Sequence, residues 1–367
     1  MEIRIPREAL HKGLSKVQGV ADARAPQPIL ANVLLEASDD GTLVLTATDF
    51  EIAVKATLEA EVVKAGRLSL NARRLYDIVR ELPEETVHLV AQQEHWAGLT
   101  CGRASFKLAG MPAEEYPPLP SYDAAQAMKL PPGVVGDMVA KTLYSVSTDE
   151  SRLVLNGVLL NLEDKSLEMV ATDGHRLAQI FGDGLEKVSE PMQVVIPRKA
   201  LHELTRLLEP EIETLEIVLQ ENHVVFLLQQ AVLIGRLIEG QFPNYDQIIP
   251  PKSEVVMTLG RQEFIQGLKR VSLMASDKSK MVKLTLASGS LTLASEDTEI
   301  GTAHEELAAE YDGEEFLIGL NSRYLLDALN AMETEEVAIG LTDPLAPGLI
   351  EPVDGGRYKC VIMPMRI

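Results

Sequence analysis

The hydrophobic and polar positions of this chain follow two periods, and the same succession of periods returns three times. The first succession predicts a strand, a turn and a second strand, and its copies span 29–49, 153–173 and 281–297. Apolar residues at every second position are typical of half-buried strands. Asp39–Gly41 and Ser288–Ser290 are hairpin signals between two of these strand pairs. Thr48, Thr172 and Glu296 occupy matching places at even spacing.

A second succession predicts a strand that leads directly into a helix. Its copies span 67–75, 194–201 and 316–325, and the apolar period changes there from 2 to about 3.6. Asn71 and Asn321 stand at that change, where an N-cap residue is favoured. Further helices are expected over 7–18, 132–146 and 261–273. Proline-rich joints at 116–120 and 249–251 separate the copies, so the pattern predicts three tandem units.

Composition narrows the class of protein without identifying a function. The chain has 367 residues, of which 46% are hydrophobic and 24% charged, as expected for two or three globular domains. Its sequence contains no apolar run long enough for a membrane span. The first residues lack the apolar core of a signal peptide. Cys101 and Cys360 stand alone, without a disulfide framework, and the chain is expected in the cytoplasm.

The position of the charges changes the interpretation of the net charge. A net charge of −21 at first argues against nucleic acid as a partner. In the six predicted helices, however, basic residues outnumber acidic ones two to one. In helix 71–82, Leu75, Ile78, Val79 and Leu82 form the expected core face, which leaves the cations towards solvent. Any amphipathic helix exposes charges, but that does not explain a basic excess in an acidic chain. A surface of such helices would suit phosphates without reading base sequence.

Several segments taken together resemble the bacterial DNA sliding clamps, the beta subunits of DNA polymerase III. The most specific are Arg24–Asn32, Leu155–Gly157, Ala171–Ala178, Ile196–Lys199, Gly240–Tyr245 and Met363–Ile367. The resemblance covers essentially the whole chain. It implies an α+β fold of three tandem copies of the DNA-clamp (processivity fold) domain, expected at 1–122, 128–250 and 253–367. Helices would line the inner face and antiparallel sheets the outside, with the ring closed by head-to-tail homodimerisation.

The same resemblance implies a non-catalytic function and a set of partners. The ring would encircle double-stranded DNA without sequence preference and tether the replicative polymerase. Partners would dock through short clamp-binding peptides, and they would include the polymerase catalytic subunit, the clamp loader, other DNA polymerases, mismatch-repair proteins and ligase. No cofactor, metal or membrane is expected.

The resemblance also places a hydrophobic peptide pocket between the second and third units, beside the C-terminus. Its expected residues are Arg152, Leu155, Thr172, Gly174, His175, Arg176, Leu177, Pro243, Ile248, Val361, Ile362, Met363, Pro364, Met365 and Arg366. Apolar anchors with an adaptable methionine surface fit such a role. The turn at Thr172 is also interpretable as purely structural, because Thr48-Asp49 repeats it. Gln247 stands where better-known relatives carry an arginine.

Two further sets of residues follow from the resemblance. The dimer interface would bring Arg103, Phe106 and Leu108 of the first unit to Leu273 and Met274 of the third, with Arg103 facing an acidic stretch. An ordinary buried strand residue is the alternative interpretation of Phe106. DNA would be faced by Arg24, Arg73, Arg80, Lys141, Arg198, Lys199, Arg206, Lys269 and Arg270. The loop at 149–154 departs from the family pattern in its acidic residue and in Leu153 and Val154.

Two other classes of protein compete with this interpretation. An enzyme would need a nucleophile or a metal beside Asp173 and His175, and the sequence shows no metal-ligand spacing and no phosphate-binding glycine loop. A scaffold of repeated domains that ignores DNA is the second alternative. A test of topological linkage to DNA separates the clamp from both.

Overall fold

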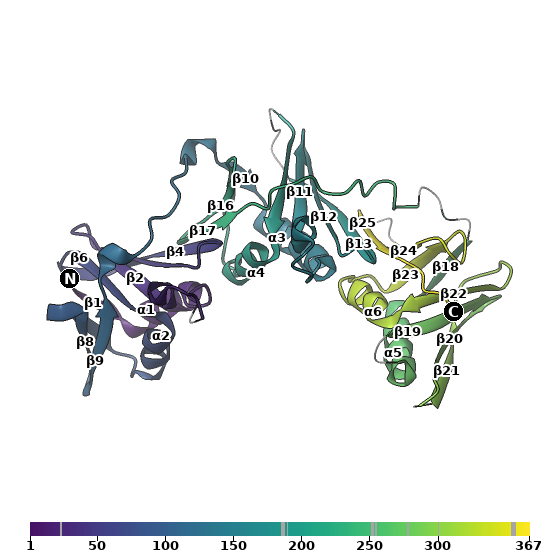
Figure 1. Cartoon of the computed structure of the whole chain (residues 1–367), viewed down its shortest axis with the longest axis horizontal. Coiled ribbons are helices and arrows are strands. Elements are labelled where there is room, and N and C mark those ends of the chain that lie inside the picture. Colours follow the sequence, from purple (N-terminus) through teal and green to yellow (C-terminus); the bar gives the residue numbers. More distant parts are fainter. Residues whose placement is uncertain are drawn as a thin grey trace. The chain divides into compact units, whose positions relative to one another are not determined.

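A computed structural model describes residues 1–22, 24–184, 188, 190–250, 253, 255–276, 279–299, 301–353 and 357–367. The chain divides into two compact units (Figure 1). The first unit contains residues 1–132 and 199–237, and the second contains 133–198 and 238–367. Of the predicted proline-rich joint at 249–251, Pro251 lies outside the described residues.

The first unit is built on one antiparallel sheet. Its strand order is β10-β15-β16-β17-β4-β3-β2-β6-β9-β8-β7-β1-β5. The strands are β1 (Glu2–Pro6), β2 (Asn32–Ala37), β3 (Thr42–Thr48), β4 (Ile52–Glu59), β5 (Glu61–Lys64), β6 (Gly66–Asn71), β7 (Thr86–Ala91), β8 (Trp96–Cys101), β9 (Ala104–Met111), β10 (Met128–Leu130), β15 (Leu215–Leu219), β16 (His223–Leu228) and β17 (Ala231–Arg236). Its helices are α1 (Arg7–Val17), α2 (Ala72–Glu81) and nearly all of α4 (Arg198–Leu207).

The second unit has two antiparallel sheets, ordered β14-β11-β12-β13-β25-β24-β23-β18 and β21-β20-β19-β22. The strands are β11 (Gly157–Glu163), β12 (Ser166–Thr172), β13 (Arg176–Gly182), β14 (Met192–Pro197), β18 (Val255–Gly260), β19 (Met281–Ala287), β20 (Ser290–Asp297), β21 (Gly301–Ala308), β22 (Phe316–Asn321), β23 (Glu336–Leu341), β24 (Gly348–Pro352) and β25 (Tyr358–Ile362). Its helices are α3 (Pro132–Thr142, whose first residue belongs to the first unit), α5 (Arg261–Val271) and α6 (Ser322–Asn330).

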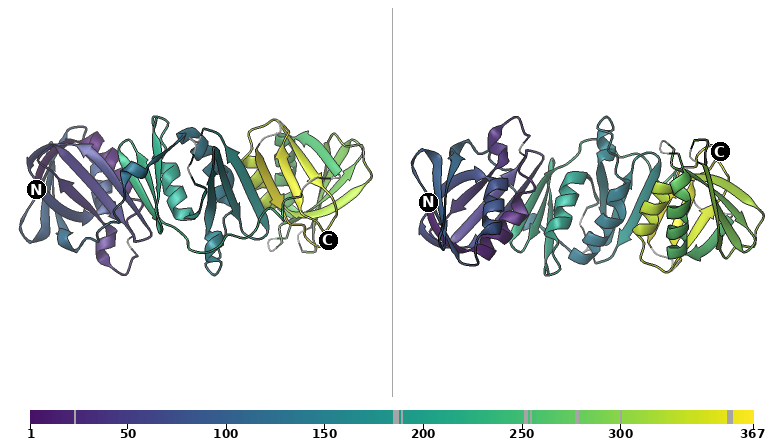
Figure 2. Two further views of the ribbon diagram at one scale, coloured as in Figure 1. Left: turned by 90° about the horizontal axis from the view of Figure 1, so that it is seen from above. Right: turned by 90° about the horizontal axis from the view of Figure 1, so that it is seen from below.

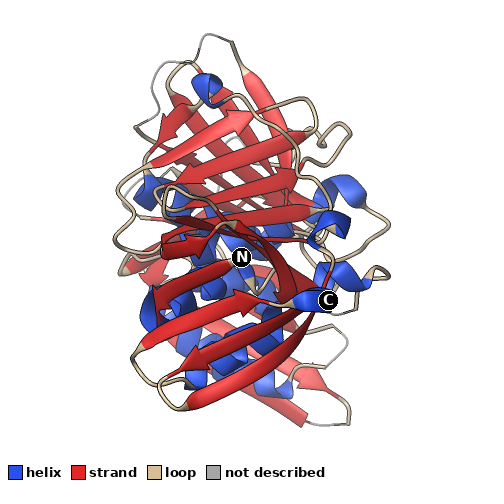
Figure 3. Ribbon diagram, turned by 90° about the vertical axis from the view of Figure 1, so that its left-hand side faces the viewer, coloured by secondary structure: helices blue, strands red, loops and turns tan. Residues whose placement is uncertain are grey.

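In each unit the helices lie against one face of the sheets (Figures 2 and 3). Leu10, Leu14 and Val17 of α1 are fully buried, and Phe264 and Leu268 of α5 are fully buried in the second unit. This alternation of buried and exposed positions is what the helical period predicted. No helix in the described part of the chain is long and apolar enough to cross a membrane.

The expected strand-to-helix junctions are confirmed. Asn71 caps α2 by accepting a hydrogen bond from the backbone N–H of Arg74 at 2.9 Å. The side chain of Asn321 accepts hydrogen bonds from the first turn of α6 in the same way. Two expected strands begin later than predicted, because Pro28–Ala31 and Leu153–Asn156 are short 3-10 helices. Proline favours the first helical turn, which explains the first of these differences.

Both units join strands that come from neighbouring copies of the repeat. In the first unit, β4 of the first copy pairs with β17 of the second copy. In the second unit, β13 of the second copy pairs with β25 of the third copy. Each of these junctions therefore uses the same two strand positions of the repeat, and each extends a sheet from one copy into the next.

Candidate functional site

The turn that follows β12 positions the first candidate site. The side-chain hydroxyl of Thr172 donates to the carbonyl of Arg176 at 2.6 Å, and it accepts from the backbone N–H of Gly174 at 3.1 Å. The carboxylate of Asp173 accepts from two further N–H groups of this turn. Thr48 and Asp49 make the same set of contacts after β3. The hydrogen bonding of the turn is therefore a feature of the repeat.

The two turns differ at their third residue, which is Gly174 in the middle copy and Phe50 in the first copy. The φ of Gly174 is +88°, and a Cβ there would come within 2.8 Å of the Arg152 guanidinium. Only glycine combines this backbone with so close an approach at no cost. In the first copy Phe50 takes a similar backbone, with φ +73°. The middle copy thus leaves room for the Arg152 guanidinium beside its turn, where the first copy carries an exposed aromatic side chain.

A cleft of about 490 Å³ opens beside this turn in the second unit. Its floor is apolar, because Leu177 and Val361 belong to a buried cluster that also contains Phe242. The lining residues are Thr172, Gly174, Arg176, Leu177, Gln247, Ile248, Ile249, Pro250, Thr342, Ala346, Pro347, Val361 and Met363. An apolar concavity with a few polar groups at its edge suits a short peptide or small molecule.

The C-terminal residues form one side of the cleft. The backbone N–H of Met363 donates to the carbonyl of His175 at 2.9 Å, which continues the pairing of β25 with β13. Two residues later, Met365 forms an isolated bridge with Gly319 on the edge of β22. These contacts hold Met363 at the cleft, with 39% of its surface exposed.

The structure brings together part of the predicted pocket set. Residues of that set that line the cleft are Thr172, Gly174, Arg176, Leu177, Ile248, Val361 and Met363. Leu155 packs against the buried cluster beneath the floor, and Arg152 donates to the Asp173 carbonyl at the rim. The others, all within the described residues, lie outside the lining: His175, Pro243, Ile362, Pro364, Met365 and Arg366. Ile362 is buried in the core.

Sequence reasoning missed one wall of the cleft. Thr342, Ala346 and Pro347 belong to the loop between β23 and β24, and Leu345 in this loop is 75% exposed. Ile249 and Pro250 were expected only as a joint between units. The available signal was the exposed apolar character of the loop, since a leucine flanked by Pro344 and Pro347 has no core position to fill.

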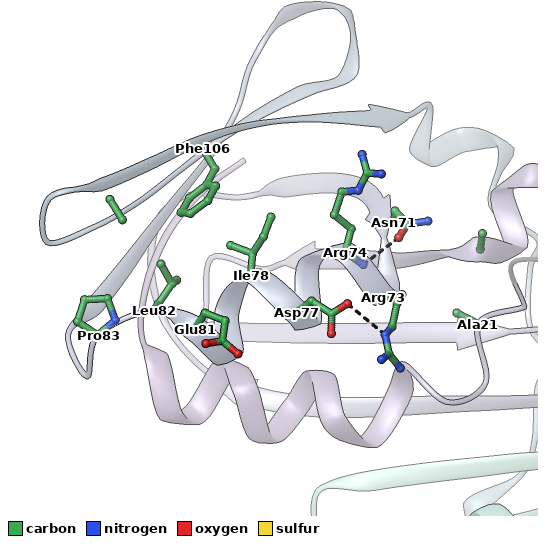
Figure 4. A pocket seen from close by; sticks show the side chains of 12 residues that line it. Ala21, Asn71, Arg73, Arg74, Asp77, Ile78, Glu81, Leu82, Pro83 and Phe106 are labelled. Atoms are coloured by element: carbon green, nitrogen blue, oxygen red, sulfur yellow. Dashed lines mark hydrogen bonds and ion pairs between the residues drawn. The ribbon is translucent and has the colours of Figure 1, made fainter.

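A second hollow lies in the first unit, between α2 and β9 (Figure 4). Its volume is about 690 Å³. Phe106, Ile78 and Leu82 line its apolar part, whereas Arg73 and Arg74 stand at the other end. Ile78 was expected in the core of α2, but it is only half-buried because it faces this hollow. Phe106 is 36% exposed, which does not fit an ordinary buried strand residue.

Beside this hollow, β9 has an open edge. Residues 104–109 pair with β8 on one side, and β6 reaches only Gly110 and Met111 on the other. In the second unit, β21 is likewise an edge strand of its sheet, paired with β20 alone within the described residues. Of the other predicted interface residues, Leu108 is mostly buried, Arg103 is exposed, Met274 is half-buried and Leu273 is 74% exposed.

Most of the cations predicted to face DNA have an acidic neighbour. The pairs are Arg73 with Asp77, Arg80 with Asp77 and Glu81, Lys141 with Asp137, Lys199 with Asp49, Arg206 with Glu203, and Arg270 with Glu305. Arg24, Arg198 and Lys269 are exposed and form no ion pair with the described residues. The pairs of Arg73 and Arg80 are exposed on both sides and contribute little, about 0–1 kcal/mol each, so a phosphate can compete for these two cations. In the other pairs at most 24% of one side chain is exposed, so solvent screens them less.

Domain models of the DNA polymerase III beta subunit match the chain over 1–120 (N-terminal domain), 129–244 (central domain) and 246–366 (C-terminal domain). The beta sliding clamp of Chlamydia muridarum is 34% identical over 367 residues, covering 100% of this chain and 99% of the relative. That of Haemophilus influenzae is 33% identical and covers 100% of both. Among solved structures, the sliding clamp of Bartonella birtlesii bound to griselimycin superposes with a TM-score of 0.96 at 34% sequence identity. A ligand-bound sliding clamp of Pseudomonas aeruginosa superposes with a TM-score of 0.95 at 30% identity. Each comparison covers 100% of both chains.

Proposed function

Because this chain belongs to the DNA polymerase III beta subunit family, the bacterial sliding clamps, we propose that two copies close into a ring around duplex DNA and tether the replicative polymerase to it. Its fold is three tandem clamp domains with antiparallel sheets. We place the domains at 1–122, 128–250 and 253–367; the matched family ranges support three consecutive domains, with the last match beginning at residue 246.

The repeated junction between copies carries this proposal. Strands β4 and β13 hold one position of the repeat, and β21 holds the same position in the third copy. Strands β17 and β25 hold the other position, and β9 holds it in the first copy. The first two copies and the last two are joined by pairing these positions. Of the six strands at these two positions, β9 and β21 keep an open edge within the described residues, so a head-to-tail dimer would complete two further junctions of the same kind.

Side chains beside the two edges are complementary. The hollow has an apolar part at Ile78, Leu82 and Phe106 with room for a leucine side chain, and Leu273 is the exposed leucine that follows α5. Arg103 lies in the turn between β8 and β9, whereas β21 carries Glu305 and Glu306. A second copy would thus insert Leu273 into the hollow and place acidic residues opposite Arg103. Sheet pairing gives the register, and the leucine adds buried apolar area.

The cleft of the second unit is the proposed docking site for partner peptides. Its apolar floor, its half-exposed Met363 and its polar rim suit a peptide with two or three apolar anchors. Through it we propose docking of the polymerase catalytic subunit, the clamp loader, other DNA polymerases, mismatch-repair proteins and ligase. We further propose that the same cleft takes griselimycin, which is bound to the clamp of Bartonella birtlesii.

The proposed ring stays on DNA because it encloses the duplex. The helix cations add a weak contact that does not depend on base sequence. Arg24, Arg198 and Lys269 would meet phosphates without first breaking an ion pair, while the net charge of −21 would discourage contact elsewhere. The chain itself would have no catalytic activity and would work in the cytoplasm. No group of acidic, histidine or cysteine side chains in the described part of the chain could hold a metal ion.

Retention on circular DNA tests the function directly. The purified protein is loaded onto nicked circular DNA by a clamp loader, and retention is compared before and after the circle is linearised. A topological ring should be lost on linearisation. Equal retention on both forms would point to ordinary electrostatic binding. Light scattering should give about twice the chain mass of 40.2 kDa, whereas a monomer at micromolar concentration would contradict the dimer.

A further inference from the structure

One wall of the cleft belongs to a segment that has no regular secondary structure of its own. Residues 238–250, termed the strap, cross the face of the β11–β13 sheet that lies away from α3 (Figure 1). Ile238 pairs with Val195 at one end, and Phe242 inserts into the buried cluster with Leu177 and Val361. Beyond Tyr245 the strap makes a turn and then lines the cleft from Gln247 to Pro250.

The strap is attached to the sheet by one polar network. The hydroxyl of Tyr245 donates to the Glu168 carboxylate at 2.9 Å. Asn161 donates to the same carboxylate at 2.7 Å, and Gln179 donates at 2.6 Å to its other oxygen. Gln193 in turn donates to the amide oxygen of Asn161 at 2.8 Å. Glu168 is only 9% exposed, so Tyr245, Asn161 and Gln179 satisfy a buried carboxylate, and Gln193 orients the Asn161 amide.

The protonation of Tyr245 suits this role. Burial raises its pKa above the ordinary value, and the neighbouring Glu168 carboxylate raises it further. The hydroxyl therefore keeps its proton at neutral and mildly alkaline pH and can always donate. Its ring meets Phe242 edge to face, with centroids 6.3 Å apart, so an apolar contact and a polar contact fix the same side chain.

The anchor is directly connected to the cleft. The backbone N–H of Ile248 donates to the carbonyl of Tyr245 at 2.9 Å, which closes the turn. The position of Tyr245 therefore sets the position of the Ile248 side chain, which is 36% exposed at the cleft. A wall that is already in place spares a ligand the entropy of ordering it.

We propose that Tyr245 and Glu168 are positioning residues, which hold the strap so that Ile248 presents a preformed wall to the incoming peptide. Neither residue need touch the peptide. This inference rests on the proposed function of the cleft and deepens it, because it assigns part of the affinity to a hydrogen bond on the sheet beside the cleft.

The test uses the full-length protein and a fluorescent peptide copied from the clamp-binding segment of the same organism's replicative polymerase. Tyr245→Phe removes the hydroxyl, and with it the hydrogen bond donated to Glu168 and the one accepted from Asn161 at 3.0 Å. We expect about a tenfold weaker Kd with faster dissociation. Glu168→Gln removes the charge of the acceptor in the same hydrogen bond and should also weaken binding of the peptide. Hydrogen exchange should rise at the amides of Gln247 and Ile248.

Tyr116→Phe is the matched control. Tyr116 also has a buried hydroxyl, which donates to backbone carbonyls of Asn32 and Thr46, but it lies in the first unit. Its variant should lose similar stability and keep its peptide affinity. If Tyr116→Phe weakens the peptide as much as Tyr245→Phe does, the effect is general destabilisation and the positioning role is wrong.

A double-mutant cycle with Ile248→Ala separates positioning from stability. With the wall preformed, Ile248→Ala should weaken the peptide about tenfold; in the Tyr245→Phe background the additional loss should be about twofold or less. Additive losses would overturn the inference. A wild-type protein that fails to bind the peptide would instead contradict the proposed function of the cleft, so the two failures are distinguishable.

Discussion

The guanidinium of Arg176 donates a hydrogen bond to the carboxylate of Asp327 at 2.6 Å, which joins strand β13 to helix α6. The same guanidinium lies 5.3 Å from the ring centre of Tyr144 and 4.5 Å from that of Tyr324. It is also paired with Asp173 at 3.1 Å. Only 10% of the side chain is exposed, so most of Arg176 is occupied within the protein and a small part faces the cleft.

Replacing Arg176 by lysine should therefore destabilise the second unit. Lysine keeps the charge, but its point-like ammonium cannot serve two carboxylates and stack between two rings. We expect a loss of about 2–3 kcal/mol in the free energy of unfolding, measured by denaturant titration. Arg152→Lys is the control, because Arg152 is 48% exposed and should change little. Equal stability of both variants would contradict this structural role.

Deleting Met363–Ile367 should abolish peptide binding and leave the dimer intact. The deletion removes Met363 from the cleft and the Met365 bridge that holds the tail on β22. Fluorescence polarisation with the polymerase peptide measures the first effect, and light scattering measures the second. Unchanged peptide affinity would rule out the cleft as the docking site.

Leu273→Ala should weaken the proposed dimer at least tenfold. Burying a leucine side chain contributes about 1.5–3 kcal/mol, and alanine retains only part of this area. Sedimentation over a dilution series gives the dimer dissociation constant. Leu345→Ala is a matched control, because Leu345 is equally exposed but lies in the β23–β24 loop. A similar effect of both changes would argue against insertion of Leu273.

Arg198→Ala should reduce DNA binding more than Arg73→Ala does. Arg198 has no acidic partner within the described residues, whereas Arg73 is 3.1 Å from Asp77. Each lost phosphate contact should lower the slope of log K against log salt concentration by about 0.9. A salt titration by polarisation on short duplexes measures this slope. If Arg73→Ala changes the slope more, the unpaired cations do not dominate the contact.

The helices and strands could be predicted because their signals are local. Asn71 and Asn321 mark helix starts in the sequence, and both side chains make the expected capping bonds. Leu75 and Val79 were expected on the core face of α2 and are buried there. Ile78 was expected beside them, but a single chain's sequence does not show that this position of α2 opens onto a hollow.

The cleft could be predicted only in part, because its walls come from segments far apart in the chain. The turn at Thr172 belongs to the recognisable segment Ala171–Ala178, and Met363 belongs to the recognisable C-terminal segment Met363–Ile367. The β23–β24 loop carries only the weaker signal of a leucine between prolines, and Glu168 carries none. From the sequence, Glu168 between the apolar residues of β12 is expected to be exposed. It is buried because Tyr245 of the strap covers it.

The open edges of β9 and β21 have a consequence for how the proposed ring opens. A head-to-tail pair has two identical junctions, and when one separates the other still holds the chains together. The separated edges then meet again at an effective concentration set by the geometry of the pair, which for tethered partners reaches the millimolar range. One gap can therefore admit a duplex and reseal without dissociation of the two chains. A clamp loader would therefore need to separate only one of the two junctions between the chains.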